Sequence, residues 1–353
     1  MSFDLVLGQD RAIAVLRSAL VSGRLAPAYL FSGPPGVGKR FTAVQLVKAL
    51  NCERGGADAC DTCSACRMVD REAFPDLYLP TRGERKIGKG SGDGTEGSLS
   101  LGEILRRLHF APVMGRWKVV LIDPAEALTA EAGNMLLKTL EEPPQKTMFL
   151  LTAVVQHSIL PTIRSRCQAL RFTPLPPEVV RRYLEGRSVQ GQLAESISRA
   201  CRGSIEVAED MIREGVMDQK ALILDYLLSL FESPLGARVD DTNRMLGSLA
   251  ESERQAVDRV HAILAILVRD LLWAASDAGT EDLVFVARSR DLVRLASRLG
   301  VRRVLDVASA AAGVGHGLRH NENPRHILLH LGNRLAALGA ALPAVARSTH
   351  ARS

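Results

Sequence analysis

Gly33-Pro34-Pro35-Gly36-Val37-Gly38-Lys39-Arg40 is the stretch of this 353-residue sequence that decides its fold. A short apolar run at residues 28–31 precedes it, and a helical pattern at residues 41–50 follows it. Strand, glycine-rich turn and helix is the context of a phosphate-binding loop, because the backbone N–H groups of the turn and the helix N-terminus point toward one anion. The sequence therefore predicts an α/β domain in which this loop and Lys39 cradle the phosphates of a nucleotide.

The last position of the loop departs from the pattern of an ATPase. A serine or threonine should follow Lys39 and place a hydroxyl on Mg²⁺, but Arg40 stands there. A guanidinium has five donors and no acceptor, so it cannot ligate a metal ion. We therefore expect weak binding of ATP or ADP and no hydrolysis.

Five short apolar runs predict the strands of a parallel sheet. They are nearly continuous in apolar residues and alternate with helical patterns, which is typical of strands covered by helices on both faces. The runs are residues 28–31, 76–79, 118–122, 148–152 and 169–172. Further amphipathic patterns predict a helix over residues 99–108, capped by Ser98 or Ser100, and another over residues 130–142.

The composition changes after residue 176 to helical patterns. We predict three domains, namely a P-loop α/β domain over residues 1–175, a small helical lid over 176–235, and an all-helical C-terminal domain over 236–353. Residues 234–241 are interpreted as a linker. Residues 82–98 contain six glycines and mixed charge, so they are interpreted as a mobile loop, with a DNA contact as the less favoured reading.

The overall charge and hydropathy restrict the class of protein. A net charge of +6 and a pI of about 9.1 permit contact with nucleic acid but do not require it. The chain has no apolar run near the ~18 residues of a membrane span and no apolar signal-peptide core. We therefore expect a cytoplasmic protein without a membrane contact.

Four of the six cysteines fall within fifteen residues, three of them at CxxC spacing. Thiolates at this spacing can close a tetrahedron around Zn²⁺, and four protein ligands leave no open position for a substrate. The alternative is a set of buried or free thiols, but the segment between these cysteines is polar. We predict a structural zinc site formed by Cys52, Cys60, Cys63 and Cys66.

Asp123 ends the third apolar run, where P-loop NTPases place the carboxylate that holds Mg²⁺. A glutamate that orients the attacking water normally follows this aspartate, but here Pro124 follows it. Glu126, three places further on, is expected to start the next helix and is a poor substitute. The sequence therefore predicts a degenerate metal site around Asp123.

Several segments together resemble the clamp-loader subunits of bacterial DNA polymerase III, within the AAA+ superfamily. They cover residues 1–175 densely and the remainder thinly, and their combination is highly specific. These segments are VLGQDRAIAVL (6–16), AYLFSGPPGVGK (28–39), the four-cysteine insertion, VVLIDPAEALTAEAGNMLLKTLEEPP (119–144), LPTIRSRC (160–167) and NENPR (321–325).

Two more departures from the ATP-hydrolysing members of this family follow from the resemblance. The strand that continues through Thr152 lacks a clear polar sensor at its tip. The hydrolysing subunits resemble one another in a Gly-Ser-x-Arg sequence in the lid, and Glu206 stands at the position of its arginine. A carboxylate therefore replaces an arginine that senses phosphate. Together with Arg40 and Pro124, these changes indicate that hydrolysis has been lost.

The resemblance implies a different role for Ser165-Arg166-Cys167. In the family, the arginine of this motif reaches into the ATP site of the neighbouring subunit. A degenerate site combined with an intact arginine finger, here Arg166, resembles the delta-prime type of subunit rather than the ATP-hydrolysing gamma/tau type. The resemblance also implies a hetero-oligomer with gamma/tau-type and delta-type subunits, which loads the sliding clamp onto primer–template DNA, and a C-terminal domain that forms an oligomeric collar.

Two alternatives stay open at this point. The first is a clamp-loader ATPase that hydrolyses ATP slowly despite Arg40 and Pro124. The turnover of such an enzyme would depend on Lys39. The second is a zinc-dependent nucleic-acid-binding module, which would bind DNA strongly and in a salt-sensitive way. The low net charge and an aromatic content of only 4% disfavour this module, because aromatic rings are what bases stack on.

Overall fold

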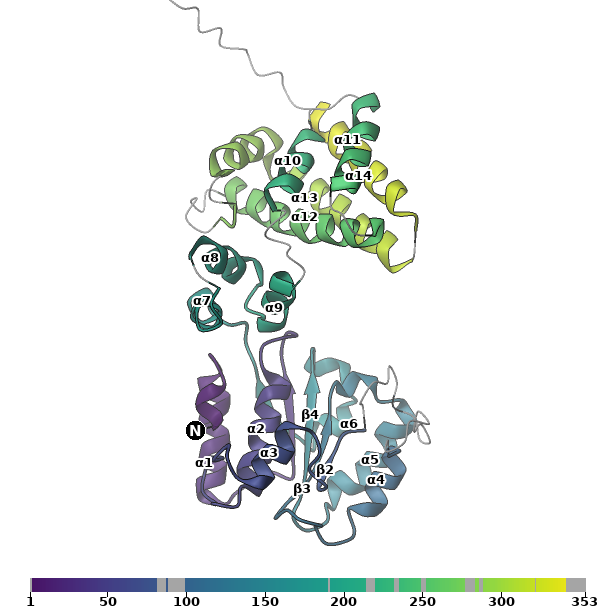
Figure 1. The fold of residues 1–353 in the computed structure, drawn as a ribbon. Helices are drawn as coiled ribbons and strands as arrows, with labels where there is room; N and C mark the ends of the chain where they lie inside the picture. The colour runs from purple at the N-terminus through teal and green to yellow at the C-terminus, as the bar shows by residue number, and fades with distance from the viewer. Residues whose placement is uncertain are drawn as a thin grey trace, which may run out of the picture. The chain divides into compact units, whose positions relative to one another are not determined.

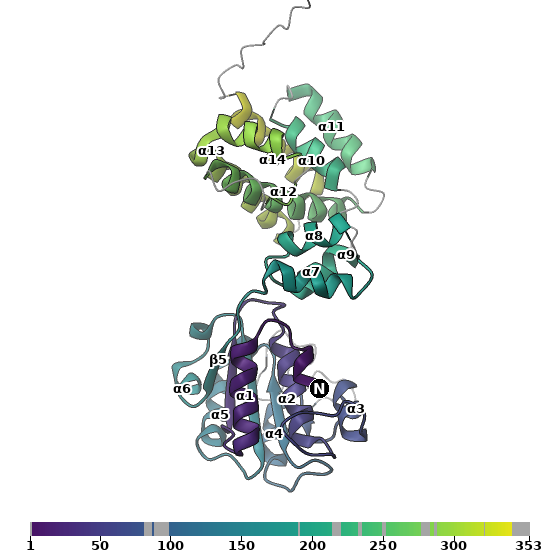
Figure 2. The same cartoon turned by 90° about the vertical axis from the view of Figure 1, so that its left-hand side faces the viewer.

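The chain divides into two compact units in the computed structural model (Figures 1 and 2). The structure describes residues 2–80, 87, 99–189, 191–213, 220–231, 235–248, 252–276, 283–285, 288–320 and 322–340. Unit 1 contains residues 1–180 and 202–207, and unit 2 contains residues 181–201 and 208–353. The two units are described separately below.

Unit 1 contains a five-stranded parallel sheet with the strand order β2-β3-β4-β1-β5. All five predicted strands are present, and no strand end differs from its predicted position by more than one residue. The strands are β1 (Ala28–Ser32), β2 (Leu77–Tyr78), β3 (Lys118–Ile122), β4 (Thr147–Ala153) and β5 (Gln168–Arg171). Every residue of β1, β3 and β4 is buried, which explains their nearly continuous apolar sequence.

Helices cover both faces of this sheet, and alternate strand residues face the two layers (Figure 1). Tyr29 and Phe31 of β1 pack with α1 (Asp10–Ser22) and α2 (Lys39–Asn51), whereas Ala28 and Leu30 pack with the opposite layer. That opposite layer includes α4 (Leu101–Arg107) and α5 (Ala130–Glu141). Figure 2 shows α1 and α2 side by side on their face of the sheet. The α/β P-loop fold predicted from the sequence is therefore correct.

The remaining elements of unit 1 are short. They are η1 (Ser2–Leu5), α3 (Ser64–Asp70), η2 (Ala125–Ala127), η3 (Gln156–Ser158) and α6 (Pro161–Arg164). Ser100 caps α4 and forms a reciprocal capping box with Glu103, as one of the two predicted caps. Glu126 lies within η2, so the expectation that it starts the next helix is wrong; Thr129 caps that helix, α5.

The described residues after 176 contain helices and no strand, as predicted. The helices are α7 (Pro177–Glu185), α8 (Gly191–Ala200), α9 (Ile205–Arg213), α10 (Lys220–Ser229), α11 (Leu235–Ser248), α12 (Glu253–Ala275), α13 (Ser289–Arg319) and α14 (Pro324–Ala340). Helix α12 contacts α10, α13 and α14 and is central to unit 2. Gly300, at φ 68°, interrupts the helical geometry of α13. The division at residue 235 into a lid and a C-terminal domain stays a prediction.

One boundary predicted from the sequence is wrong. Residues 234–241 were expected to form a linker, but α11 begins at Leu235 and continues to Ser248. Gly236, which contributed to the linker prediction, is the second residue of this helix, where a glycine disrupts few intrahelical hydrogen bonds.

Two predicted segments lie largely outside the described residues. One is the glycine-rich segment 82–98 except for Ile87, and the other is the end of the predicted C-terminal domain from residue 341. Ile87 is buried and bridges Leu128. Within the part of the chain that the structure describes, no helix is both long and apolar enough to cross a membrane.

Candidate functional site

The phosphate loop joins β1 to α2 in the conformation that its glycines permit. Gly36 and Gly38 have φ values of 70° and 93°, in the left-handed region that other residues rarely adopt. Lys39 is the first residue of α2, and its ammonium donates to the carbonyl oxygens of Gly33 and Pro34 at 2.7 and 2.6 Å. Burial lowers the pKa of Lys39, while the carboxylates of Asp123, Glu126 and Glu206 act in the opposite direction. The loop thus retains a lysine at its centre.

Arg40 is held by two carboxylates on the surface next to this loop. Its Nη1 donates to Oδ2 of Asp123 at 2.9 Å, and its Nη2 pairs with Glu72. Partial burial by itself would lower the pKa of Arg40, but the hydrogen bonds to Asp123 and Glu72 outweigh it, and the pKa is raised. The permanently charged guanidinium of Arg40 is therefore bonded to the carboxylate that the sequence predicts as a ligand of Mg²⁺.

The carboxylates of Asp123 and Glu126 both bond to other groups of the protein. The second oxygen of Asp123 accepts the hydroxyl of Thr152, near the end of β4. The expectation that this strand lacks a clear polar sensor at its tip stays a prediction. Glu126 accepts the backbone N–H of Val154 at 2.6 Å and the hydroxyl of Ser158 at 3.1 Å. Glu126 therefore holds the turn after β4.

The segment before α9 packs on the phosphate loop within unit 1. The N–H of Ile205 donates to the carbonyl of Gly36 at 2.9 Å. A Cβ at Gly36 would lie 1.9 Å from Oγ of Ser204 and 2.8 Å from Cβ of Glu206, so the close approach requires glycine. Glu206 therefore adds a negative charge beside the loop, where a phosphate sensor would need a positive one.

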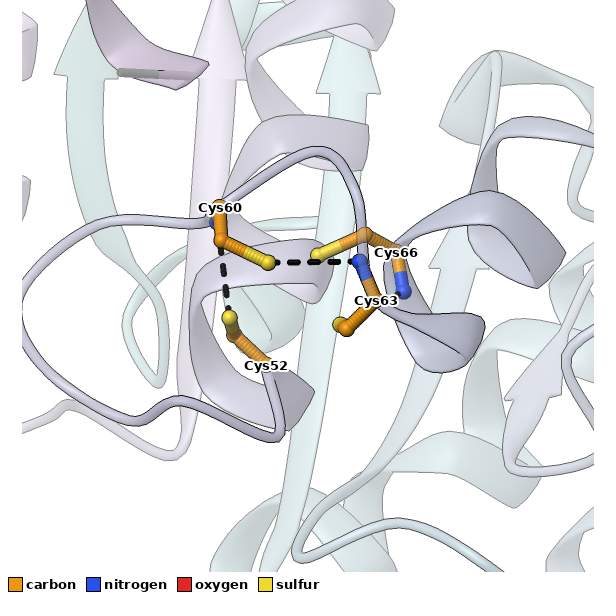
Figure 3. Close-up of side chains that lie close together, drawn as sticks. All are labelled: Cys52, Cys60, Cys63 and Cys66. Atoms are coloured by element: carbon orange, nitrogen blue, oxygen red, sulfur yellow. Dashed lines mark hydrogen bonds between the residues drawn. The ribbon is translucent and has the colours of Figure 1, made fainter.

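The four cysteines of the insertion lie together, with their sulfur atoms within 4.8 Å of one another (Figure 3). Cys52 follows α2, Cys60 lies in the loop, Cys63 caps α3, and Cys66 is inside α3. Backbone N–H groups donate to sulfur at 3.3–3.4 Å, as in thiolate sites. Hydrogen bonds from Thr62 lower the pKa of Cys60 to about 5. A tetrahedral Zn²⁺ with Zn–S distances of ~2.3 Å requires sulfur separations of about 3.8 Å, so the set fits a zinc ion.

The insertion has almost no apolar core of its own. Its only buried cluster consists of Cys52, Ala59 and Cys66, together with the other two cysteines. Ion pairs attach it to α2: the buried ammonium of Lys48 pairs with Asp61 and, at 2.9 Å, with Asp70. These contacts join the cysteine cluster to the helix that follows the phosphate loop.

Arg166 lies between α6 and β5, at the amino end of that strand. Its Nη1 donates to the carbonyl of Thr162 at 2.9 Å, and its Nη2 pairs with Glu141 at the end of α5. The side chain is one-third exposed (33%), so it is aimed by its neighbours and still accessible. Cys167, the next residue, has its pKa raised to about 12 by burial and is not a reactive thiol.

Comparison with known proteins relates this chain to subunits of DNA polymerase III. A family model described as "DNA polymerase III, delta subunit" matches residues 8–176. Subunit tau of Escherichia coli is 30% identical over 313 residues, which are 88% of this chain and 45% of that protein. Subunit delta-prime of Bacillus subtilis is 30% identical over 216 residues, which are 61% of this chain and 63% of that protein. Residues 8–176 therefore form a domain of this DNA polymerase III family, and the chain is similar to tau and delta-prime subunits of that polymerase.

The tau relatives are longer than this chain. It spans about half the length of the tau subunits that it matches, 45% in Escherichia coli and 51% in Bacillus subtilis. Among solved structures, a gamma-subunit-related protein of Thermotoga maritima has a TM-score of 0.43 at 16% identity, over 93% of this chain and 99% of that one. The delta clamp-loader protein of Bacillus subtilis has a TM-score of 0.36 at 11% identity, over 93% and 99%.

The structure brings together most residues that the sequence indicated for this clamp-loader site. Lys39, Arg40 and Asp123 surround the phosphate loop, and Glu206 lies beside it, while Arg166 is separate. Sequence reasoning missed Glu72 as a partner of Arg40, because it lies 32 residues away in an insertion without a motif. It also missed Glu141 as the partner of Arg166, although the Leu-Glu-Glu-Pro-Pro segment was part of the family resemblance.

Proposed function

We propose that this clamp-loader chain is a delta-prime-like subunit that does not hydrolyse ATP itself. It joins gamma/tau-type and delta-type subunits in a hetero-oligomer and supplies Arg166 to a neighbouring ATP site during loading of the sliding clamp onto primed DNA. The observation that carries the proposal is the pair between Arg40 and Asp123, because it fills the magnesium position with a guanidinium.

The charges around the phosphate loop support the absence of hydrolysis. The two cations at the loop are Lys39 and Arg40. They interact electrostatically with four carboxylates, which belong to Glu72, Asp123, Glu126 and Glu206. A nucleoside triphosphate brings further negative charge, and without a bound divalent ion Lys39 and the backbone N–H groups of the loop offset this charge less fully. Weak binding of ATP or ADP by the loop backbone is proposed, but in-line attack by an oriented water is not.

The position of Arg166 supports a role outside its own subunit. Arg166 precedes β5, whereas the phosphate loop follows β1, so the two lie at opposite ends of neighbouring parallel strands. Its planar guanidinium can contact two oxygens of a transferring phosphoryl group at once. Thr162 and Glu141 restrain two nitrogens of the Arg166 guanidinium. Less side-chain entropy is therefore lost when this arginine engages a phosphate.

The cysteine cluster supports a structural zinc ion in this function. The ion would replace an apolar core that the insertion lacks, and it would take no part in phosphoryl transfer. A slow ATPase remains the second candidate, because Lys39 and the glycines of the loop are retained.

The distinguishing experiment measures ATP hydrolysis by the purified chain and by its Lys39→Ala variant. The proposal predicts no hydrolysis above background for either protein, together with co-elution of the wild-type chain with purified gamma/tau-type and delta-type subunits. Turnover by the isolated chain that Lys39→Ala abolishes would establish the slow ATPase, and failure to co-elute would exclude the clamp-loader role.

A further inference from the structure

Glu72 adopts a backbone conformation that glutamate rarely takes, with a φ of 54° in the left-handed region. It lies just after α3, where its N–H donates to the carbonyl of Val69 at 3.0 Å. The N–H of Ala73 donates to the carbonyl of Met68 at 2.9 Å. These two bonds form the Schellman motif of a helix C-terminus, in which the left-handed position is usually glycine. A strained glutamate at this position indicates a role for its side chain.

The side chain of Glu72 pairs with Arg40, the second residue of α2. The other terminal nitrogen of this guanidinium donates to Asp123 at 2.9 Å. Both terminal nitrogens are therefore engaged by carboxylates, although Arg40 directly follows Lys39 at the end of the phosphate loop. A guanidinium released from Glu72 would be a charged donor beside the phosphates of a bound nucleotide.

A second set of ion pairs joins α2 to the insertion. Lys48 lies about two turns after Arg40 on α2, and its ammonium is buried. It pairs with Asp61, which belongs to the cysteine segment, and at 2.9 Å with Asp70, the last residue of α3. Two cations of α2 are therefore paired with carboxylates of the insertion and of α3, and Glu72 makes the pair nearest the phosphate loop.

The cysteine cluster is one of the anchors of α3. The sulfur of Cys63, directly before this helix, accepts the N–H of Cys66 at 3.4 Å, and Cys66 lies fully buried within the helix. The other anchors are the buried side chains of Ala65 and Val69. A helix of seven residues is not stable by itself, so its position depends on these anchors. Two of the four predicted zinc ligands thus hold one end of α3, and Glu72 follows the other end.

We propose that Glu72 couples the cysteine cluster to the phosphate loop, because it withholds Arg40 from a bound nucleotide while zinc holds the four cysteines together. The inference rests on the proposed function, in which the chain binds nucleotide weakly and carries a structural zinc ion. The element with two states is the guanidinium of Arg40, which is either bonded to Glu72 or released to contact phosphate oxygens. Such coupling is reciprocal, so a bound nucleotide also weakens the affinity of the cluster for zinc.

The test measures the affinity for ADP by titration calorimetry, without Mg²⁺, in the zinc-loaded and the zinc-free full chain. Zinc is removed with a chelator, which is then taken out by gel filtration. The wild-type chain should bind ADP about fivefold more tightly without zinc, and ADP should lower its zinc affinity by the same factor. Glu72→Gln keeps the shape of the side chain but removes its charge. This variant should therefore bind ADP as tightly as the zinc-free wild type, both with and without zinc.

Glu72→Gly separates this role from a structural one. Glycine fits the left-handed φ, so the variant should keep its zinc and unfold near the wild-type temperature. It should nevertheless lose the effect of zinc on ADP affinity. Glu53→Gln is the matched control, because this exposed carboxylate also lies in the insertion but bonds to Ser64 instead of Arg40. The control should retain the effect of zinc.

Equal ADP affinities of the zinc-loaded and zinc-free wild-type chain would overturn the inference. An unchanged effect of zinc in Glu72→Gln or Glu72→Gly would also overturn it, as would loss of that effect in the control. A wild-type chain that binds no zinc, or no ADP in either form, would do the same. Failure of the proposed function is seen separately, as Lys39-dependent hydrolysis or as failure to co-elute with loader subunits, and this binding measurement includes neither.

Discussion

Arg40 donates a hydrogen bond of 2.9 Å to Asp123, which lies 83 residues later in the sequence. This contact engages the carboxylate that the sequence predicts as a magnesium ligand. The same guanidinium also pairs with Glu72, so its charge is used within the protein and is not free for a nucleotide. Arg40 thus links the end of the phosphate loop to both carboxylates.

Replacing Arg40 tests this relationship. Arg40→Thr returns a hydroxyl to the end of the loop and releases Asp123, so nucleotide binding should become stronger in Mg²⁺ than in a chelator. The wild-type chain should show little difference between the two conditions. Hydrolysis should stay absent in the variant, because Glu126 remains bonded to Val154 and Ser158. Nucleotide affinity is measured by titration calorimetry, and Mg²⁺-dependent binding by the wild-type chain would contradict the account.

Glu206 should weaken nucleotide binding through its charge. Glu206→Gln removes one negative charge beside Gly36, which is worth about 1 kcal/mol near the protein surface, so affinity for ADP should rise about fivefold. Glu178→Gln, an exposed change on α7, is the control and should have no effect. Equal affinities for wild type and Glu206→Gln would show that this carboxylate does not act on the loop.

Zinc should be required for the folded structure of the insertion but not for that of the sheet. The purified chain should contain about one equivalent of zinc, and Cys63→Ser should lose it, whereas Cys201→Ser should keep it because Cys201 lies outside the cluster. Removing zinc should increase hydrogen exchange in residues 52–70 and leave β1, β3 and β4 protected. A zinc content below about half an equivalent, in protein prepared without chelator, would count against the site.

Much of the fold followed from local patterns. The strands of the sheet are apolar over their whole length because both faces are covered, so β1, β3 and β4 were recognisable at once. The cysteine cluster was recognisable because its four cysteines are close to one another in the sequence. The degenerate loop was recognisable because Arg40 breaks a fixed motif.

Contacts between distant residues could not be predicted in this way. Nothing local to Glu72 or Thr152 shows that these residues meet Arg40 and Asp123, since the contacts depend on the packing of α3 and β4. The conformation of residues 113–117 depends on Asn51 and Asp76, which lie far from them in sequence. The start of α11 was missed because Pro and Gly are common both in linkers and at helix ends.

The central claim is that Arg166 acts on the ATP of a neighbouring subunit. The most direct measurement is DNA- and clamp-stimulated ATP hydrolysis by a loader reconstituted with wild-type chain, Arg166→Ala or Arg164→Ala. Arg164 is the matched control, because it lies two residues away and contacts His157 instead of Glu141. In related NTPases an arginine finger contributes about 10³–10⁵ in rate, although the fingers of other subunits reduce the loss seen for a whole loader. The account predicts that Arg166→Ala assembles normally but loses much of the stimulated hydrolysis and clamp loading, while Arg164→Ala retains both. Clamp loading by Arg166→Ala at the wild-type rate would contradict it.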